Sequence, residues 1–347
     1  MNRHRFALAC LLALLLIGIS QAQLPPPIRK TPPGGDIVLF RAVVERLRAG
    51  EPYYAAMRSE LRSRAYPTAS IFNWRPPATF LFLAKAPGAA HVAMVGLAAV
   101  AIALTVLVFR NAPPLLTIIA VLLQIGGVLL PAIPTDGLYM PETWTGIFIL
   151  LSVLSYTLGA VRCAVCSAIA AICARELALP YVAACCGLAL YERRTEELRW
   201  YAIGLCVFVA YYGIHAVMAT SHTQAGDMAH TYSWIAFGGW QFVVQTVAMG
   251  GWFLMLAPWT AAVGAVVVLA SLWGPADRHL KALVLIYLFG FCVVGQSFNT
   301  YWGLMTGPSW GLGIPYGLIG VHRLIKASIR ALPGAPLETS AEAVLPP

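Results

Sequence analysis

One carboxylate, Asp36, stands at the start of a charged amphipathic stretch, GGDIVLFRAVVERLRAGEPYY, which covers residues 34–54. A carboxylate next to a reacting hydroxyl group can take its proton as the oxygen attacks, and so act as a general base. Aspartate is also one of the preferred residues at a helix N-terminus, where it caps free N–H groups. The local sequence favours capping, and the two roles are compatible.

Basic residues surround this carboxylate in the sequence. Residues 25–88 contain ten basic and four acidic residues, a net charge of +6. Guanidinium groups can bind phosphate oxygens with paired hydrogen bonds and stabilise a departing phosphate. A basic, aromatic-rich segment at headgroup level would therefore attract an anionic lipid phosphate.

Two further acidic positions fall in connections on the same expected side. Asp136 and Glu142 lie in IPTDGLYMPETW, where the first could form a turn and the second could begin a helix. Acceptor binding or assistance in catalysis is the alternative for both. Arg175 and Glu176 are adjacent in RELALP, and a structural ion pair at the interface is one interpretation of them.

A metal site is not indicated. His215, His222, Asp227 and His230 share one region, but their spacings of seven, five and three match no compact ligand pattern, so a polar loop is favoured. We therefore expect no cofactor, with dependence on a divalent cation left open. The eight cysteines lie mostly in apolar stretches and are interpreted as packing residues.

The elements that must position these groups are membrane helices. With 59% apolar and 11% charged residues, the chain of 347 residues is far from the composition of a soluble domain. It has room for about ten crossings of roughly 20 residues each, which predicts an all-α polytopic membrane protein. The apolar runs cover residues 6–24, 90–109, 114–131, 143–160, 163–175, 177–191, 200–218, 252–272, 280–296 and 309–325.

The basic residues between these runs predict the orientation. Alternate connections are basic, and the connections near 132–142, 219–251 and 297–308 contain no Lys or Arg. Short cytoplasmic loops carry such an excess of Lys and Arg, so the second group is expected outside. The first run also resembles a signal peptide, with small residues at Ser20 and Ala22.

The short runs 163–175 and 177–191 could form one tilted helix or two crossings. Arg162 precedes the pair and Arg193 and Arg194 follow it, and these arginines should share one side of the membrane. Two crossings satisfy that condition, with a turn at the outer surface between the two runs.

The segment after Asp36 has one apolar helical face, which is typical of a helix at the membrane interface. Gly50 and Pro52 are expected to end this helix. The apolar positions are Ile37, Phe40, Val43, Val44 and Leu47.

These segments together resemble a known family. An apolar first helix, GGDIVLFRAVVERLRAGEPYY, RPP leading back to the membrane, RELALPYV and NTYWGLMTGPSWGLG occur in the order seen in the GT-C superfamily of membrane glycosyltransferases. Within it, the chain is most similar to the bacterial family 87 type of mannosyltransferase-like proteins. The likeness covers most of the chain, although no single motif is diagnostic.

The resemblance implies an inverting enzyme with a GT-C-like fold, which moves a hexose or pentose, mannose-like by preference, from a polyprenyl-phosphate donor to a glycan, lipid or protein acceptor. In such enzymes an acidic residue in the first outer loop is the base, and Asp36 occupies that position. Cations would stabilise the departing lipid phosphate. The candidates are Arg58, Arg62, Arg64, Arg75 and Arg175, and a role of Arg175 and Glu176 toward the donor phosphate is the alternative to a structural ion pair. Asn299, Tyr301 and Trp302 would border the sugar site, or serve as aromatic anchors.

A transporter and a membrane acyltransferase are the alternatives. The first would use polar groups such as Gln124, and the second a buried histidine, His215 or His91. We expect one membrane domain over residues 1–330, with an outer loop at 25–88, and a disordered cytoplasmic tail at 331–347. The expected location is the bacterial cytoplasmic membrane, with the site outside, membrane lipids as partners and no nucleic acid.

Overall fold

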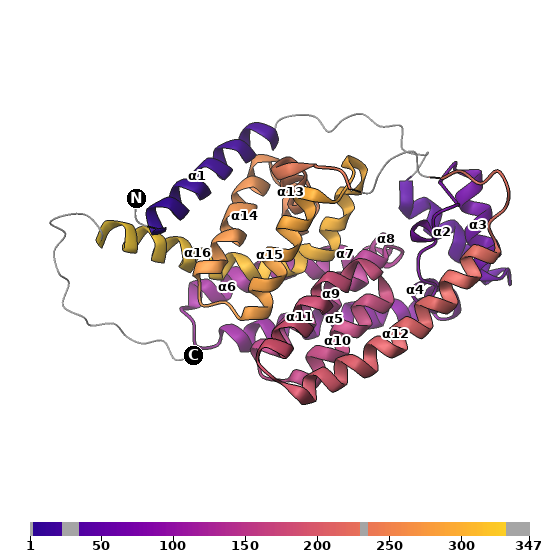
Figure 1. Cartoon of the computed structure of the whole chain (residues 1–347), viewed down its shortest axis with the longest axis horizontal. Coiled ribbons are helices and arrows are strands. Elements are labelled where there is room, and N and C mark those ends of the chain that lie inside the picture. The colour runs from indigo at the N-terminus through magenta and orange to yellow at the C-terminus, as the bar shows by residue number, and fades with distance from the viewer. Residues whose placement is uncertain (1–2, 23–34, 230–234, 331–347) are drawn as a thin grey trace.

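A computed structural model describes residues 3–22, 35–229 and 235–330 of the chain. Helices and their connections make up all of these residues apart from a single isolated bridge between Ile235 and Val294. Figure 1 shows the helices gathered into one bundle, with α2, α3 and α4 grouped at one side. The expected tail at 331–347 and part of the expected outer loop lie outside the described residues.

The first half of the chain contains the apolar helix α1, then a group of shorter helices, and then further apolar helices. Its helices are α1 (Arg3–Ala22), α2 (Gly35–Arg48), α3 (Tyr53–Ser63), η1 (Ile71–Asn73), α4 (Ala78–Lys85), α5 (Pro87–Phe109), α6 (Pro114–Gln124), η2 (Ile125–Leu129), α7 (Leu130–Ala132), α8 (Thr135–Leu138) and α9 (Pro141–Thr157). In the second half are α10 (Val161–Ala174), η3 (Glu176–Ala178), α11 (Leu179–Tyr191), α12 (Thr195–Ser221), α13 (Gly239–Ala248), η4 (Gly251–Met255), α14 (Trp259–Ala270), η5 (Ser271–Trp273), α15 (Arg278–Val293), η6 (Ser297–Trp302) and α16 (Gly303–Arg330).

Every expected apolar run contains a helix, which confirms the all-α prediction. Four stretches in the described part of the chain are long and apolar enough to cross a bilayer. They are Arg3–Ala22, Pro87–Phe109, Pro114–Ala132 and Thr195–Ser221. Three others are shorter apolar helices of the bundle, and α13 has no counterpart among the expected runs.

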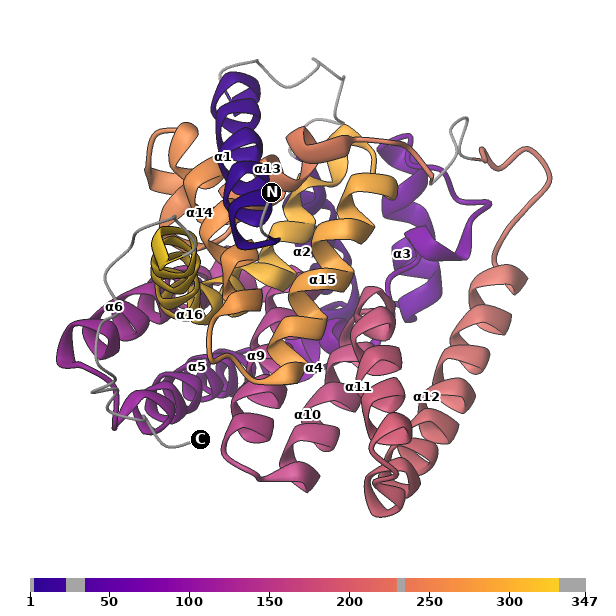
Figure 2. The ribbon, with the colours of Figure 1, turned by 60° about the vertical axis from the view of Figure 1, so that its left-hand side comes forward.

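The two short runs form two helices that fold back on each other. Helix α10 ends at Ala174, the turn η3 follows, and α11 leads back. The opposite ends of the pair line one cavity, to which both Arg162 and Arg194 contribute. Two helices rather than one tilted helix therefore occupy residues 161–191, and Figure 2 shows them beside α12.

The apolar face of α2 is covered by the protein itself. Phe40, Val43 and Val44 are buried, and the Phe40 ring lies 5.2 Å from that of Phe80 in α4. Helices α3 and α4 pack on this face. The expectation that the face lies against the membrane interface is therefore wrong, because the returning chain occupies that position. Gly50, in a left-handed conformation at φ 92°, follows the helix end as expected.

Helix α16 runs through the centre of the bundle in close contact with its neighbours. A methyl group added at Gly317 would collide with the Val267 carbonyl, and one at Gly320 would collide with the Ala270 carbonyl. Only hydrogen fits at these two positions, so the backbones of α14 and α16 touch. The glycines of this segment thus permit close packing.

Helix α1 packs on the same part of the bundle. Its Gly18 lies against Ala262 of α14 and Trp240 of α13, and the Arg5 guanidinium donates two hydrogen bonds of 3.2 Å to the Ser328 carbonyl near the end of α16. The N-terminal end of α1 and the C-terminal end of α16 therefore lie together. Both carry basic residues, as expected for connections on one side of a membrane.

Candidate functional site

Asp36 lies in the first turn of α2, and its carboxylate reaches across to a distant part of the loop. The Tyr66 hydroxyl donates a 2.6 Å hydrogen bond to Asp36 Oδ1. Burial and the nearby Asp36 carboxylate raise the pKa of Tyr66 well above its ordinary value, so this hydroxyl stays protonated and remains a donor. The carboxylate thus makes a tertiary contact, although its position in the first turn also favours the helix dipole.

The second oxygen of this carboxylate faces Arg75. Asp36 Oδ2 lies 3.9 Å from Arg75 Nη2, and the Asp36 side chain keeps 20% of its exposed area. Arg75 is buried and is held by two other groups: it donates to the Phe72 carbonyl at 2.6 Å and to the Tyr301 hydroxyl at 3.0 Å. We call Asp36, Tyr66, Arg75 and Tyr301 the Asp36 cluster. The contact between Asp36 Oδ2 and Arg75 Nη2 is long, so that oxygen can still accept a hydrogen bond.

A second group of charges is almost entirely buried, and we call it the Arg175 cluster. Arg175 follows α10, and its Nε donates a 2.8 Å hydrogen bond to Glu142 Oε1 at the start of α9. Arg175 also pairs with its neighbour Glu176. The Arg175 and Glu142 side chains are 3% and 1% exposed. Two carboxylates share one guanidinium here, and one oxygen of each, Oε2, is buried without a hydrogen-bond partner in the described chain.

Tyr301 of η6 links the two clusters. Burial raises the pKa of Tyr301 to about 12, with Arg75 opposing this effect. Asp36 and Glu142 also act to raise this pKa, and Arg175 acts to lower it. Tyr301 is therefore within electrostatic reach of charged groups from both clusters. Six of the expected site residues therefore meet in one region of the bundle: Asp36, Arg75, Glu142, Arg175, Glu176 and Tyr301.

The remaining arginines of the first loop have other surroundings. Arg62 lies 3.5 Å from Asp227 and 3.3 Å from the Gln224 side chain. Arg64 pairs with Glu60, whose carboxylate also binds Arg46. Arg58 differs, because its Nε and Nη2 atoms are buried and lack a hydrogen-bond partner among residues 3–22, 35–229 and 235–330.

Three other expected residues lie apart from the two clusters. Asp136 is exposed and pairs with Arg41 of α2. Trp302 is buried in a group of aromatic rings, with its ring 6.3 Å from Phe242 and 6.0 Å from Phe291. Trp302 is therefore packed inside the protein and is not a lipid-facing anchor. The rings that it contacts belong to neither cluster. Asn299 is buried, with its Nδ2 atom unpartnered within the same described residues.

The histidine region forms an aromatic contact instead of a ligand set. His215 is buried in α12, and its Nδ1 lies 3.1 Å from the Tyr54 hydroxyl. The Tyr54 ring also approaches His222 at 5.6 Å. His230 lies outside the described residues. Among the residues that are described, no group of three or more His, Cys, Asp or Glu side chains is placed to hold a metal ion.

The cysteine prediction is correct only in part. Cys185 is buried, whereas Cys163, Cys166 and Cys206 are exposed free thiols on the outer faces of their helices. The packing interpretation is wrong for these three and for Cys10, which is also exposed, because apolar surroundings in the sequence also occur on a face that would contact lipid.

Sequence reasoning missed Tyr66 and Glu60. Tyr66 lies 30 residues from Asp36, and nothing in its local sequence identifies a carboxylate partner. Glu60 is 6% exposed, and hydrogen bonds from Arg46 and Arg64 lower its pKa although burial works in the other direction. A run of arginines around one glutamate, RSELRSR, was the available signal.

Comparisons with protein-family models, with curated proteins and with solved structures give no match.

Proposed function

We propose that this protein is a membrane glycosyltransferase of the GT-C type, which transfers a sugar from a polyprenyl-phosphate donor to an acceptor hydroxyl, with Asp36 as the general base. The observation that supports this most is the Asp36 cluster. It offers a carboxylate whose side chain is 20% exposed, next to a buried guanidinium and at the end of the bundle where the Arg175 cluster also lies.

In the proposed reaction, the acceptor oxygen attacks the anomeric carbon and loses its proton to Asp36 Oδ2. The bond between that carbon and the phosphate oxygen breaks, and the electron pair leaves with the lipid phosphate. Attack from the opposite face inverts the anomeric centre. The Tyr66 hydroxyl holds the other carboxylate oxygen, which fixes the orientation of the base.

The arginines divide into two roles under this proposal. Arg58 is the cation best suited to the lipid phosphate, because two of its nitrogens have no hydrogen-bond partner in the described chain. Arg175 is less suited, since Glu142 and Glu176 already neutralise it and it is 3% exposed. We assign Arg175 to holding these two carboxylates, whose unpartnered oxygens could accept hydrogen bonds from sugar hydroxyls.

The proposed location is the bacterial cytoplasmic membrane, crossed about ten times. The four long apolar stretches support membrane insertion. The basic connections lie at the opposite end of α10 from Arg175, because Arg162 is in the first turn of that helix. A cytoplasmic position for this basic end puts the Asp36 cluster on the outer side. Residues 35–85 would then face outward, and finding them in the cytoplasm would overturn the proposal.

The decisive experiment measures transfer of labelled sugar from polyprenyl-phosphate donors in membranes that contain Asp36→Asn at wild-type levels. Asparagine keeps the shape and the capping ability but cannot take a proton, so we expect activity to fall about 100-fold or more. The matched control is Asp136→Asn, which alters an exposed carboxylate that pairs with Arg41. Full activity of Asp36→Asn in folded protein would remove Asp36 from the chemistry.

The acyltransferase alternative has one supporting observation. His215 is buried in the apolar helix α12, and its Nε2 has no hydrogen-bond partner in the described chain. Acyl transfer that survives Asp36→Asn but is abolished by His215→Gln would favour this alternative over glycosyl transfer. The transporter alternative gains less, because the buried Gln124 amide already donates to the Pro308 carbonyl at 3.0 Å.

A further inference from the structure

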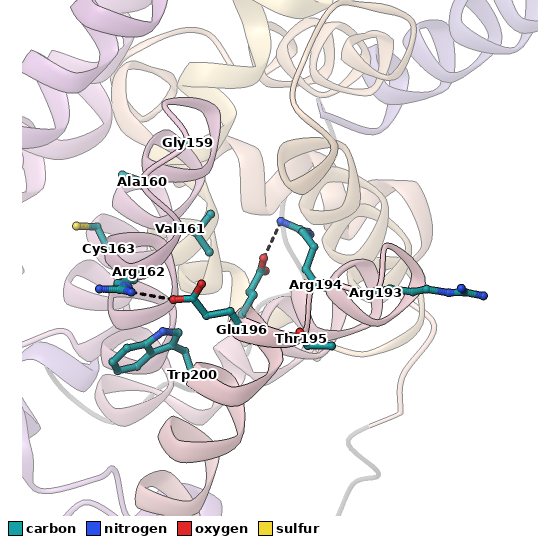
Figure 3. A pocket seen from close by; sticks show the side chains of 11 residues that line it. Gly159, Ala160, Val161, Arg162, Cys163, Arg193, Arg194, Thr195, Glu196 and Trp200 are labelled. Atoms are coloured by element: carbon teal, nitrogen blue, oxygen red, sulfur yellow. Dashed lines mark hydrogen bonds and ion pairs between the residues drawn. The ribbon is translucent and has the colours of Figure 1, made fainter.

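A cavity of about 690 Å³ lies at the basic end of the bundle, far from the Asp36 cluster. Its walls are the connection from α9 to α10, the connection from α11 to α12, and the first turns of α10 and α12 (Figure 3). Helix α10 separates it from Arg175 by 14 residues, or roughly 21 Å of helix. The cavity therefore cannot belong to the site described above.

One wall of the cavity carries an exposed, exchangeable ion pair. Arg162 donates a 2.8 Å hydrogen bond to Glu196, and its guanidinium lies 5.6 Å from the centre of the Trp200 ring. The two charged side chains are 73% and 70% exposed. Pairs this exposed add little stability. A stronger anion could therefore replace Glu196 on Arg162, while the Trp200 ring keeps the guanidinium oriented.

The other wall contains two arginines, one whose charge is balanced by carboxylates and one that has no ionic partner in the described chain. Arg194 lies 2.6 Å from Glu197 and 2.9 Å from Glu192, so its charge is already balanced. Arg193 is exposed, and its side chain makes no ion pair or hydrogen bond in the described chain. It extends away from Arg162 in Figure 3. Its backbone has the left-handed φ of 57°, which is uncommon for a residue other than glycine.

Backbone donors add to these charges. Helices α10 and α12 both begin at the cavity, and neither has a side chain that caps its first N–H groups. Such groups have no acceptor inside the helix and favour an anion. Arg162 and the cavity provide the specific recognition, and the two helix ends strengthen it.

We propose that this cavity binds a phosphate group, carried by a membrane phospholipid or by a soluble phosphate ester. A phosphate has several oxygens and can contact Arg162 with two of them while another faces the helix ends. The volume exceeds that of a bare phosphate and leaves room for an attached glycerol. Because α12 is long and apolar enough to cross a bilayer, its first turn and Trp200 would lie at headgroup level.

The chain contains its own reporter for this site. Cys163 is exposed and lines the cavity, whereas Cys166, one turn further along α10, is exposed but outside it. Two variants of the full chain, each with one of these cysteines and alanine at the other seven cysteine positions, form a matched pair. The measured quantity is the rate at which an uncharged maleimide labels the thiol.

The probe is the surrounding lipid. Each single-cysteine protein is placed in nanodiscs of phosphatidylcholine, with or without phosphatidic acid, and glycerol 3-phosphate is added to a separate phosphatidylcholine sample. We expect phosphatidic acid to slow labelling of Cys163 about fivefold with little change at Cys166. Surface charge alone would slow both thiols equally. Protection by glycerol 3-phosphate in the neutral nanodiscs would identify a soluble ligand as sufficient.

Two substitutions complete the test. Arg162→Ala should remove the protection of Cys163, and Glu196→Gln should extend it to lower amounts of phosphatidic acid, because the competing carboxylate is gone. An unchanged labelling rate at Cys166 shows that each variant is folded. The proposal is overturned if neither phosphate source protects Cys163, if both thiols are protected alike, or if protection persists in Arg162→Ala.

Discussion

The charged side chains at the two ends of α10 differ in their exposure to solvent. At one end, Arg175 and Glu142 are 3% and 1% exposed, and their partners come from separate helices. At the other, Arg162 and Glu196 are 73% and 70% exposed beside an open cavity. A buried charge cannot lose its partner without a large penalty, whereas an exposed one can exchange partners freely. One end is suited to a fixed geometry and the other to reversible binding.

The largest expected effect is on stability at the buried end. Arg175→Met would leave Glu142 and Glu176 buried without a cation, which should destabilise the protein by about 3–5 kcal/mol. Thermal unfolding in detergent would measure the loss. The matched control is Arg162→Met at the exposed end. Equal destabilisation by the two changes would show that burial is not what distinguishes the two ends.

Under the proposed glycosyl transfer, a smaller effect is expected on kcat. Tyr66→Phe removes the hydroxyl that donates to Asp36 Oδ1 but keeps the ring. A hydrogen bond to a charged group contributes about 1.5–3 kcal/mol, so kcat should fall at least about tenfold. Steady-state kinetics would separate kcat from KM, and KM should remain near the wild-type value. A rise in KM alone would assign Tyr66 to substrate binding.

Glu60 is an intermediate case, because its carboxylate is buried while Arg46 is 41% exposed. Hydrogen bonds from Arg46 and Arg64 hold its pKa below 4.5 against the effect of burial. The stability it provides is therefore present at neutral pH and is lost as pH falls through the lowered pKa. Glu60→Gln should reduce the Tm by about 2–4 °C at pH 7. The difference from wild type should shrink in acid, and a constant difference would contradict this explanation.

The smallest effect is expected at the cavity. Glu196→Gln should change the Tm by less than about 1 °C, because it breaks only an exposed ion pair. Thermal unfolding in neutral detergent would test this. A marked loss of stability would mean that Glu196 has a structural role and would weaken the contrast between the two ends.

The apolar runs predict the helices well because each run must bury its backbone hydrogen bonds and its side chains at once. The prediction fails where a helix contains polar residues or where a proline interrupts an apolar run. Helix α13 contains Gln241 and Gln245 and was not expected, and the run 252–272 is split at Pro258 into η4 and α14. The apolar face of α2 was correctly located, but the pattern cannot say whether protein or lipid covers it.

The candidate site was predictable in composition but not in arrangement. Asp36, Arg75 and Arg175 stood out because charges are rare in this chain. Their partners did not, since Tyr66 and Tyr301 carry no local sign of a nearby carboxylate. Arg75 and Tyr301 are 226 residues apart, and only the packing of η6 against the first loop joins them.

That separation has a consequence for the order in which the protein is made. At a synthesis rate of about 5–20 residues per second, Tyr301 leaves the ribosome roughly 10–45 s after Arg75. During this interval the first loop has emerged without the hydroxyl that holds its arginine. The Asp36 cluster is therefore completed only after Tyr301 has been synthesised, and a chain truncated before Tyr301 would present the carboxylate and the arginine without their final support.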